Sequence, residues 1–285
     1  MPAILLLVIL LASLLAGCVS GGARSDGVPS ADAPFTLTAL DVGQGDATLL
    51  RTGQVAVLVD TGDPDADVVR LLRREGVDRL DLLVVTHAHL DHVGGAAAVL
   101  AAMPVSVVWM HPVPDAHPVV AEHHAALREA ELHGVPVRGP PEGASVALGD
   151  LVLEVLGPPP GRPYDWTRGE INNTSIVLRA TVAGAGSVLL AGDAEREAQA
   201  DLLANHRDRL RADVLVVPHH GSRTSDPGFL LATGASLAII SVGRGNRHGH
   251  PAVEIVDALE AAGMDVRRTD RDGTVRIGLA GIAAG

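Results

Sequence analysis

The chain has 285 residues, 47% of them hydrophobic, and a formal net charge of −12. This length allows one large domain or two small ones with a sizeable core. The aromatic residues are only two Phe, two Trp and one Tyr, so Val, Leu, Ile and Ala must fill that core. A chain that grips nucleic acid is expected to show a basic stripe and base-stacking aromatics. The present chain has a negative net charge and few aromatic residues, which weighs against strong, non-specific DNA binding by this chain alone.

The amino terminus carries an apolar stretch over residues 3–17, followed by Cys18, the only cysteine in the sequence. The stretch is shorter than the roughly 20 residues of a membrane span but suits the core of a signal peptide. The run Leu15-Ala16-Gly17-Cys18 resembles a bacterial lipobox, in which the cysteine is acylated after cleavage. We therefore expect a lipoprotein signal peptide over residues 1–17 and an exported protein, held at the extracytoplasmic face of the cell membrane by a lipid at Cys18. The alternative is an uncleaved anchor with a buried cysteine.

Residues 18–34 are rich in Gly, Ser, Ala, Asp and Pro, which predicts a flexible tether. Short strands are then expected over residues 35–40, 47–51 and 55–59. The pair Gly43 and Gly45 is not a dinucleotide fingerprint, because a strand and not a helix follows it. Asp46 and Asp60 stand at turn positions, where capping of the turn is their ordinary role. An amphipathic helix is predicted over residues 65–75.

The most informative stretch is Thr86-His87-Ala88-His89-Leu90-Asp91-His92, which follows a predicted buried strand over residues 80–85. Three imidazoles and one carboxylate are thus expected on a loop at the carboxyl end of a strand, where open α/β sheets place ligands. Imidazole and carboxylate bind zinc and other first-row divalent metals. On such a loop His87 and His89 can converge on one ion while Asp91 and His92 turn toward a second. The alternative is a polar loop rich in surface histidines.

The remainder of the chain alternates strands with helices. Helices are predicted over residues 94–102, 194–209 and 252–262, and strands over residues 105–109, 146–155 (two), 176–182, 187–190, 212–217, 237–242, 266–268 and 274–277. Tyr164 and Trp166 lie in the irregular stretch 157–168, which is either a substrate wall or a packed surface loop. Several further histidines match no ligand spacing and are expected to be solvated or structural: His111, His117, His123, His124 and His133.

The HxHxDH pattern resembles the signature of the metallo-β-lactamase superfamily. The similarity extends, in the same order, to motifs of the hydrolase domain of ComEC-type DNA-uptake proteins. These motifs are Leu40–Ala47, Val59–Gly62, Asn172–Ser175, Leu190–Asp193, Val217–Ser222 and Gly249–Pro251. The resemblance implies an α/β (α+β) fold, a four-layer αββα metallo-β-lactamase sandwich, as one domain over residues 35–281.

The resemblance also implies two divalent ions, Zn²⁺ or Mn²⁺, held by nitrogen and oxygen ligands. The expected ligand sets are Asp91, His92, Asp193 and His250 for one ion, and His87, His89 and Asp193 for the other. Asp193 would bridge the ions with its two oxygens. The superfamily usually adds a histidine where this chain has Asn172-Asn173, so water, Asn173 or a histidine of the pair His219-His220 is expected to complete the second set.

Two metals about 3.5–4 Å apart can share a hydroxide and stabilise attacking and leaving oxygens. Asp91 is expected to hold that hydroxide as well as a metal. His220 is placed like the proton donor of related phosphodiesterases; the alternative is that His219 and His220 are a metal ligand and a structural neighbour. Suitable phosphate-binding groups are expected from Ser222, Arg223, Thr224 and Asn173, with Ser225 beside them. Helix capping is the alternative for the hydroxyl residues.

These observations favour an exported metal-dependent hydrolase, a phosphodiesterase or nuclease-like enzyme that acts on a phosphodiester or nucleic-acid substrate. The first alternative is a hydrolase of the same fold that cleaves a lactam, lactone or thioester. The second is a non-catalytic surface accessory in DNA uptake. With one apolar stretch the chain is not expected to form a membrane channel, and no protein partner is predictable.

Overall fold

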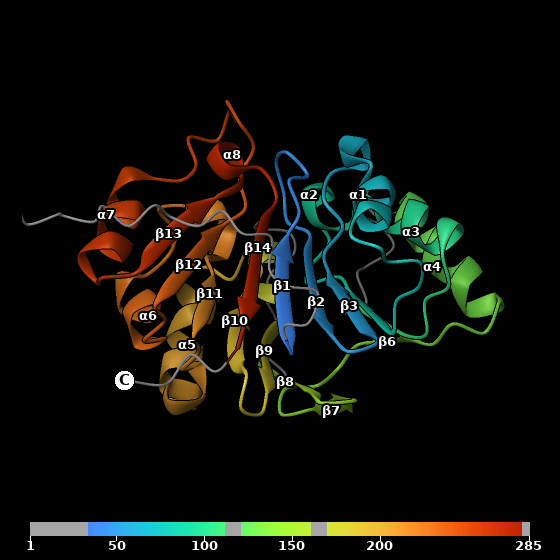
Figure 1. The fold of residues 1–285 in the computed structure, drawn as a ribbon, viewed down its shortest axis with the longest axis horizontal. Helices are drawn as coiled ribbons and strands as arrows, with labels where there is room; N and C mark the ends of the chain where they lie inside the picture. Colours follow the sequence, from blue (N-terminus) through green and yellow to red (C-terminus); the bar gives the residue numbers. More distant parts are fainter. Residues whose placement is uncertain (1–33, 112–120, 161–169, 281–285) are drawn as a thin grey trace, which may run out of the picture.

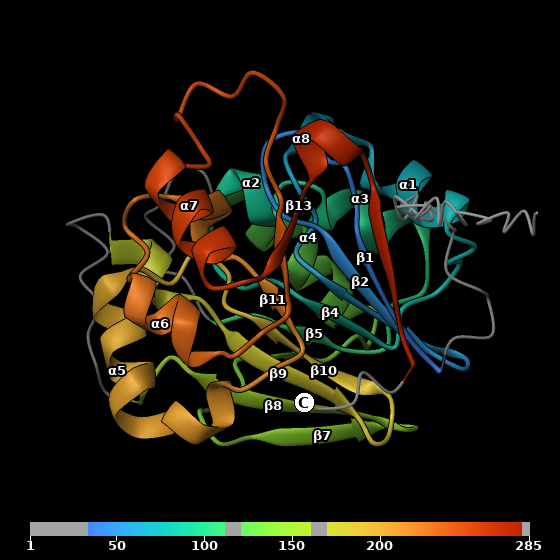
Figure 2. The same cartoon turned by 60° about the vertical axis from the view of Figure 1, so that its left-hand side comes forward.

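The computed structural model describes residues 34–111, 121–160 and 170–280. Within them the strands form two sheets that face one another, with helices outside each sheet (Figures 1 and 2). The first sheet consists, in spatial order, of β14 (Val275–Leu279), β1 (Phe35–Ala39), β2 (Thr48–Thr52), β3 (Val55–Val59), β4 (Leu82–Val84), β5 (Val108–Trp109) and β6 (Val137–Arg138). The second consists of β13 (Asp265–Arg268), β12 (Leu237–Ile240), β11 (Val214–Val216), β10 (Gly186–Leu190), β9 (Val177–Val182), β8 (Leu151–Gly157) and β7 (Ser145–Leu148).

Both sheets are mixed in the same way. In the first, β3 to β6 run parallel, while β14, β1, β2 and β3 pair antiparallel. In the second, β10 to β13 run parallel and β7 to β10 pair antiparallel. The pairing of Phe35 with Leu279 joins the first and last described strands. Each sheet therefore has a parallel half whose strand ends are available for polar loops.

Helices cover the outer face of each sheet (Figure 1). On the first sheet these are α1 (Val68–Arg74), α3 (Ala96–Ala102) and α4 (Ala121–Leu132), and on the second they are α5 (Arg196–His206), α6 (Pro227–Ala232) and α7 (Val253–Ala261). The remaining helical turns of the described residues are α2 (Leu90–Val93), α8 (Thr269–Asp272), η1 (Pro64–Ala66), η3 (Glu170–Thr174), η4 (Arg207–Leu210) and η5 (Pro218–Gly221). None of the described helices is long and apolar enough to cross a membrane.

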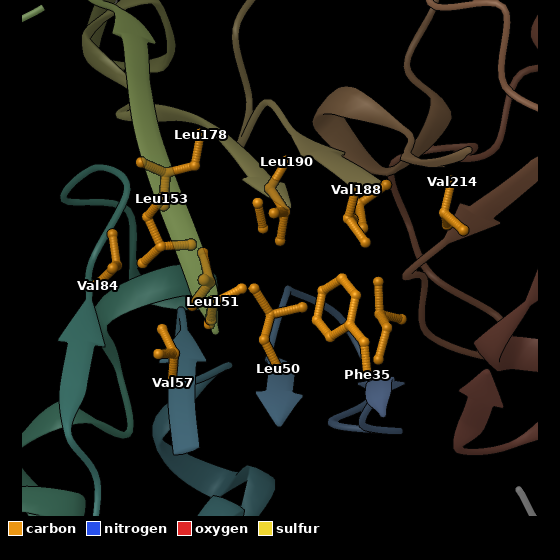
Figure 3. Close-up of a cluster of buried hydrophobic side chains, with 14 of the residues drawn as sticks. Phe35, Leu50, Val57, Val84, Leu151, Leu153, Leu178, Val188, Leu190 and Val214 are labelled. Atoms are coloured by element: carbon orange, nitrogen blue, oxygen red, sulfur yellow. The ribbon is translucent and has the colours of Figure 1, made fainter. Parts of the chain in front are cut away.

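The described apolar side chains form three separate clusters, one under each helical layer and one between the sheets. Figure 3 shows the middle cluster, where Phe35 and Leu50 of the first sheet face Val188 and Leu190 of the second. The burial of strand β4 explains why its sequence is a continuous apolar run. Leu82 and Val84 enter the middle cluster and Leu83 enters the helical one, so both faces of the strand are buried. Three apolar interfaces define four layers, which confirms the predicted αββα sandwich.

The predicted elements are present with shifted ends. The stretch expected as one helix over 194–209 is divided into α5 and η4, and the short helix α6 was not predicted. Asp91 and His92 lie on the one-turn helix α2, not on a loop. The predicted signal peptide, Cys18 and the tether up to residue 33 fall outside the described residues, as do Tyr164 and Trp166. The single domain over 35–281 therefore stays a prediction.

The middle cluster offers a matched pair of substitutions on β8. Leu153 is fully buried between the sheets, whereas its neighbour Val152 points outward and is 37% exposed. We expect Leu153→Ala to lower the free energy of unfolding by about 2–5 kcal/mol, because it leaves a cavity. Val152→Ala should lower it by no more than about 1 kcal/mol. Urea denaturation measures both; equal losses would contradict this orientation of β8.

Candidate metal centre

Asp60 fixes the start of the histidine-rich segment. It follows β3, and its backbone adopts a left-handed φ of 61°. The buried carboxylate accepts hydrogen bonds from the backbone N–H of Thr86 at 2.7 Å and from the Thr86 hydroxyl at 2.8 Å, and it lies 2.9 Å from Nδ1 of His92. Beyond its turn position, Asp60 thus holds Thr86 at the neighbouring strand end and His92 on α2 in place.

The second support for this segment is Gly45. A Cβ atom built on Gly45 would lie 2.1 Å from the carbonyl oxygen of Asp91, and the φ of Gly45 is +111°. Glycine is needed here because the backbones touch: the N–H of Asp46 donates to the same carbonyl at 3.0 Å. The buried Asp46 carboxylate then lies with one oxygen 3.7 Å from Nδ1 of His220. The Gly-Gln-Gly turn therefore brings Asp46 beside His220, a contact beyond the turn capping expected from its position.

Two strand ends of the second sheet supply the rest of the site. Asp193 follows β10, and its N–H donates to the hydroxyl of Ser175 at 3.0 Å. After β11 the chain turns through η5, where His219 and His220 have φ of 50° and 53°. The N–H of His219 donates to the carbonyl of Gly192 at 3.0 Å. This bond ties the two strand ends together beside Asp193.

The two oxygens of Asp193 face two different pairs of histidines. Oδ1 lies 3.1 Å from Nε2 of His92 and 3.8 Å from Nε2 of His220. Oδ2 lies 3.8 Å from Nε2 of His87 and 3.7 Å from Nε2 of His219. The carboxylate of Asp193 is therefore shared between two clusters of imidazole nitrogens, which is the arrangement expected of a bridging ligand.

Two residues of the histidine-rich segment complete these clusters. Nδ1 of His89 lies 3.1 Å from Nε2 of His87, on the Oδ2 side. Oδ2 of Asp91 lies 3.3 Å from Nε2 of His220, on the other side. The structure thus brings together all the predicted ligands of the segment from His87 to His92.

The four histidines around Asp193 share one orientation: each turns Nε2 inward and gives Nδ1 a partner elsewhere in the protein. Nδ1 of His220 donates to the carbonyl of Ser241 at 3.0 Å. The other partners of Nδ1 are the Asp60 carboxylate for His92, the Thr86 hydroxyl for His87 and the Glu195 carboxylate for His219. Metal-binding histidines carry such a partner on the nitrogen that does not touch the metal.

Unsatisfied polar atoms test whether this cluster suits a metal. Nε2 of His92, Nε2 of His220 and Oδ1 of Asp193 are all buried without a well-aligned hydrogen-bond partner, although two of them are only 3.1 Å apart. Buried polar atoms are rarely left unpaired. Potential ligand atoms of His87, His92 and Asp193 lie within 4.8 Å of one another, as do those of Asp91, His92 and His220. This set of nitrogen and oxygen donors fits a divalent ion such as Zn²⁺ or Mn²⁺.

Electrostatics in the cluster show how strongly the groups interact. Burial alone would raise the pKa of Asp193, but His92 and His220 outweigh it and hold that pKa well below its usual value. Burial would likewise lower the pKa of His220, yet the carboxylates of Asp193 and Asp46 raise it to about 9. For Asp46, burial dominates and raises the pKa to about 6. A site with such paired shifts is a candidate for function.

His250 lies beside the cluster, not within it. Its ring centroid is 5.4 Å from that of His219 and 6.3 Å from that of His220. Among the described residues, no ion pair joins a nitrogen of His250 to Asp91 or Asp193, and His220 faces both carboxylates at the position expected for His250. Burial and the charges of His219 and His220 lower the pKa of His250 to about 4.

Three of the four predicted substrate-binding residues make hydrogen bonds inside the protein. Ser222 is buried, and its hydroxyl accepts hydrogen bonds from the backbone N–H and the hydroxyl of Thr224. The Thr224 hydroxyl also lies 3.1 Å from Nδ1 of His219. The side-chain oxygen of Asn173 accepts from the backbone N–H of Glu195. Only Arg223 stays largely exposed, beside a cavity.

Residues 40–169 match the family model described as the Metallo-beta-lactamase superfamily. The chain is 33% identical to Competence protein ComA of Neisseria gonorrhoeae, over 93% of this chain and 35% of that protein. It is 30% identical to ComE operon protein 3 of Bacillus subtilis, over 83% of this chain and 32% of that protein. The chain thus spans about a third of the length of these relatives.

Among solved structures, the metallo-beta-lactamase fold protein YhfI from Bacillus subtilis resembles this chain with a TM-score of 0.55 at 13% identity. The similar region covers 86% of this chain and 100% of the YhfI chain. At this identity the likeness concerns the fold alone.

The contact at Gly45 predicts a position-specific cost. Gly45→Ala should lower the free energy of unfolding by about 2–5 kcal/mol, because it adds backbone strain and a clash with Asp91. Gly53→Ala is the matched control: its φ is +53° and a Cβ there meets nothing within 4 Å, so about 1–2 kcal/mol of backbone strain is expected. Thermal or urea denaturation measures the difference. If both variants lose the same stability, Gly45 does not make this close approach.

Proposed function

We propose that this metallo-β-lactamase-fold, metal-dependent hydrolase, which is related to bacterial competence proteins, acts on nucleic acid. In this proposal it cleaves phosphodiester bonds with a pair of divalent ions. The observation that carries this proposal is the division of the Asp193 carboxylate between two groups of histidines. A carboxylate that offers one oxygen to each of two ions can hold them close together, and the two oxygens of Asp193 face different histidines as such a bridge would require.

We assign four ligands to each ion. His87, His89, His219 and Asp193, through Oδ2, would hold the first ion. Asp91, His92, His220 and Asp193, through Oδ1, would hold the second. The proposal moves His220 from proton donor to ligand, because its Nε2 is buried without a partner and lies between Asp91 and Asp193. It moves His250 from ligand to the substrate side of the site, where its ring is only partly covered.

When bound, the ions supply an activated water and stabilise charge on the oxygens of the scissile phosphate. The side chains around the ions would position the attacking water and the phosphate. Asp91 has 27% of its side chain exposed, whereas the side chains of Asp193 and His92 are nearly or fully buried. Asp91 is therefore the carboxylate that reaches the open side of the cluster and can orient the attacking water. His250 stands beside His219 and His220 and can hydrogen-bond a phosphate oxygen or the leaving group.

Two features support a phosphodiester substrate. A cavity of about 450 Å³ is lined by Glu195 and Thr224, which both contact His219, and its charged lining also includes two arginines and two further glutamates, Arg196, Arg223, Glu197 and Glu254. Guanidinium groups bind phosphate in a bidentate manner. The relatives that the chain matches over most of its length are named as competence proteins, and the motif resemblance to ComEC-type DNA-uptake proteins makes DNA the expected substrate.

The first test is activity with added metal. The purified protein, freed of metal and resupplied with Mn²⁺ or Zn²⁺, should cleave bis-p-nitrophenyl phosphate and single-stranded DNA. Asp193→Asn should lower turnover by more than about 100-fold, beyond the loss typical of residues that only support a ligand. His133→Ala, which changes an exposed histidine, is the control and should keep activity. Cleavage of nitrocefin alone would favour the lactam alternative, and metal binding without turnover would favour the accessory role.

The second test separates His220 from His250. His220→Ala should reduce the bound metal, measured by elemental analysis after dialysis, from two ions per chain toward one. His250→Ala should leave both ions bound and lower turnover only. The reverse result, with metal lost from the His250 variant and retained by the His220 variant, would restore the ligand set expected from sequence.

Lipid anchoring at Cys18 on the extracytoplasmic face remains part of the proposal. Its support is the lipobox-like run before the cysteine. Mass spectrometry of the mature amino-terminal peptide tests it, because a cleaved and acylated Cys18 has a defined mass.

A further inference from the structure

Glu195 lies against the outer side of His219. It precedes α5, two residues after Asp193, and its Oε1 is 3.1 Å from Nδ1 of His219. The same oxygen accepts a hydrogen bond from the side-chain amide of Asn172 at 3.0 Å. A carboxylate that is already held by a neighbour thus meets the nitrogen of His219 that points away from Asp193.

The pair Asn172-Asn173 holds Glu195 at two points. In addition to the amide of Asn172, the side-chain oxygen of Asn173 accepts the backbone N–H of Glu195 at 2.9 Å. Both asparagines are buried, with exposures of 7% and 3%. These side chains are therefore directed at Glu195, and this contact gives the pair a function without placing an amide on a metal.

His219 needs such support more than the three buried histidines that surround Asp193. Its side chain is 19% exposed, whereas those of His87, His92 and His220 are at most 2% exposed. Packing fixes the rings of the buried histidines. The partly exposed ring of His219 can rotate unless a hydrogen bond holds it. His219 also adopts a left-handed backbone, so its ring direction does not follow from a regular strand.

We infer that Glu195 is the positioning residue of one metal site: by accepting the Nδ1–H of His219, it holds Nε2 of that ring toward Oδ2 of Asp193. The inference rests on the proposed dinuclear function. It adds a chain of contacts, from Asn172 through Glu195 to His219, that controls only the ion on the Oδ2 side. The second ion depends on His220, whose Nδ1 donates instead to the carbonyl of Ser241.

The hydroxyl of Thr224 limits the size of the effect. It lies 3.1 Å from Nδ1 of His219 and donates to the Ser222 hydroxyl at 3.1 Å, so it can take over as a weaker acceptor if Glu195 is removed. Loss of Glu195 should therefore weaken one site without abolishing it.

Calorimetric titration of the metal-free full chain with Mn²⁺ tests the inference. Glu195→Ala should weaken the binding of one ion by about 10–100-fold and leave the other within about 2-fold, the range seen when a partner of a ligating histidine is removed. Glu195→Gln should lose less affinity than Glu195→Ala, because its amide oxygen still accepts from His219. Glu254→Gln is the matched control: this glutamate lines the same cavity, is 60% exposed and should bind both ions as the wild type does.

The outcomes separate this inference from the proposed function. If the wild type binds two ions and Glu195→Ala binds them equally well, the inference is overturned while the dinuclear site stands. If Glu195→Ala weakens both ions alike and lowers the melting temperature of the metal-free chain, Glu195 is a general structural residue and the inference also fails. If the wild type binds no ion, the proposed function itself is wrong.

Discussion

The buried carboxylate of Asp193 is the constraint on which the rest of the site depends. A carboxylate with 3% of its side chain exposed is costly to keep ionised, and several kcal/mol is a typical penalty for a buried charge. His92 and His220 on one oxygen, together with His87 on the other, offset that penalty and hold the pKa of Asp193 low. The same crowding places imidazole nitrogens against one another, as with His87 and His89 at 3.1 Å. A cluster of this kind favours a bound cation, because a cation satisfies the carboxylate and the facing nitrogens together.

The four-layer fold supplies the rigidity that such a cluster requires. Beyond the carboxyl ends of β3, β4, β10, β11 and β12, within three residues of each strand, the chain reaches Asp60, Thr86, Asp193, Pro218 and Ser241. Hydrogen bonds hold these residues within and between the sheets. Within the first sheet, the carboxylate of Asp60 accepts from the N–H of Thr86, and between the sheets the carbonyl of Thr86 accepts from the N–H of Ile176. Because the apolar layers fix each strand on both faces, the loops at the rim inherit fixed positions, and ligands distant in sequence meet within about the length of a side chain.

The sequence was sufficient where the signal is local. The apolar run before Thr86 and the dense HxHxDH segment predicted a strand and its ligands, since the residues that act together are neighbours in the chain. Asp193 was predictable for the same reason, as a carboxylate that ends an apolar strand. The sequence could not predict which of His220 and His250 faces Asp91 and Asp193, because both follow parallel strands that end at one rim. The inward turn of His220 depends on its backbone conformation and on the Ser241 carbonyl. Glu195 gave no signal, because its contact with His219 spans 24 residues and a different strand end.

The backbone conformation of His219 and His220, which follow β11, explains how two adjacent histidines both face the carboxylate of Asp193. In an extended strand, neighbouring side chains point to opposite faces, so His219 and His220 could not both face Asp193. Left-handed φ at both residues turns both rings inward, with Nε2 atoms 3.7 and 3.8 Å from different oxygens of Asp193. Such conformations cost about 1–3 kcal/mol each outside glycine. The bonds from the N–H of His219 to the carbonyl of Gly192 and from the N–H of Ser222 to the carbonyl of His219 hold this turn, and they allow two consecutive residues to face the two oxygens of Asp193.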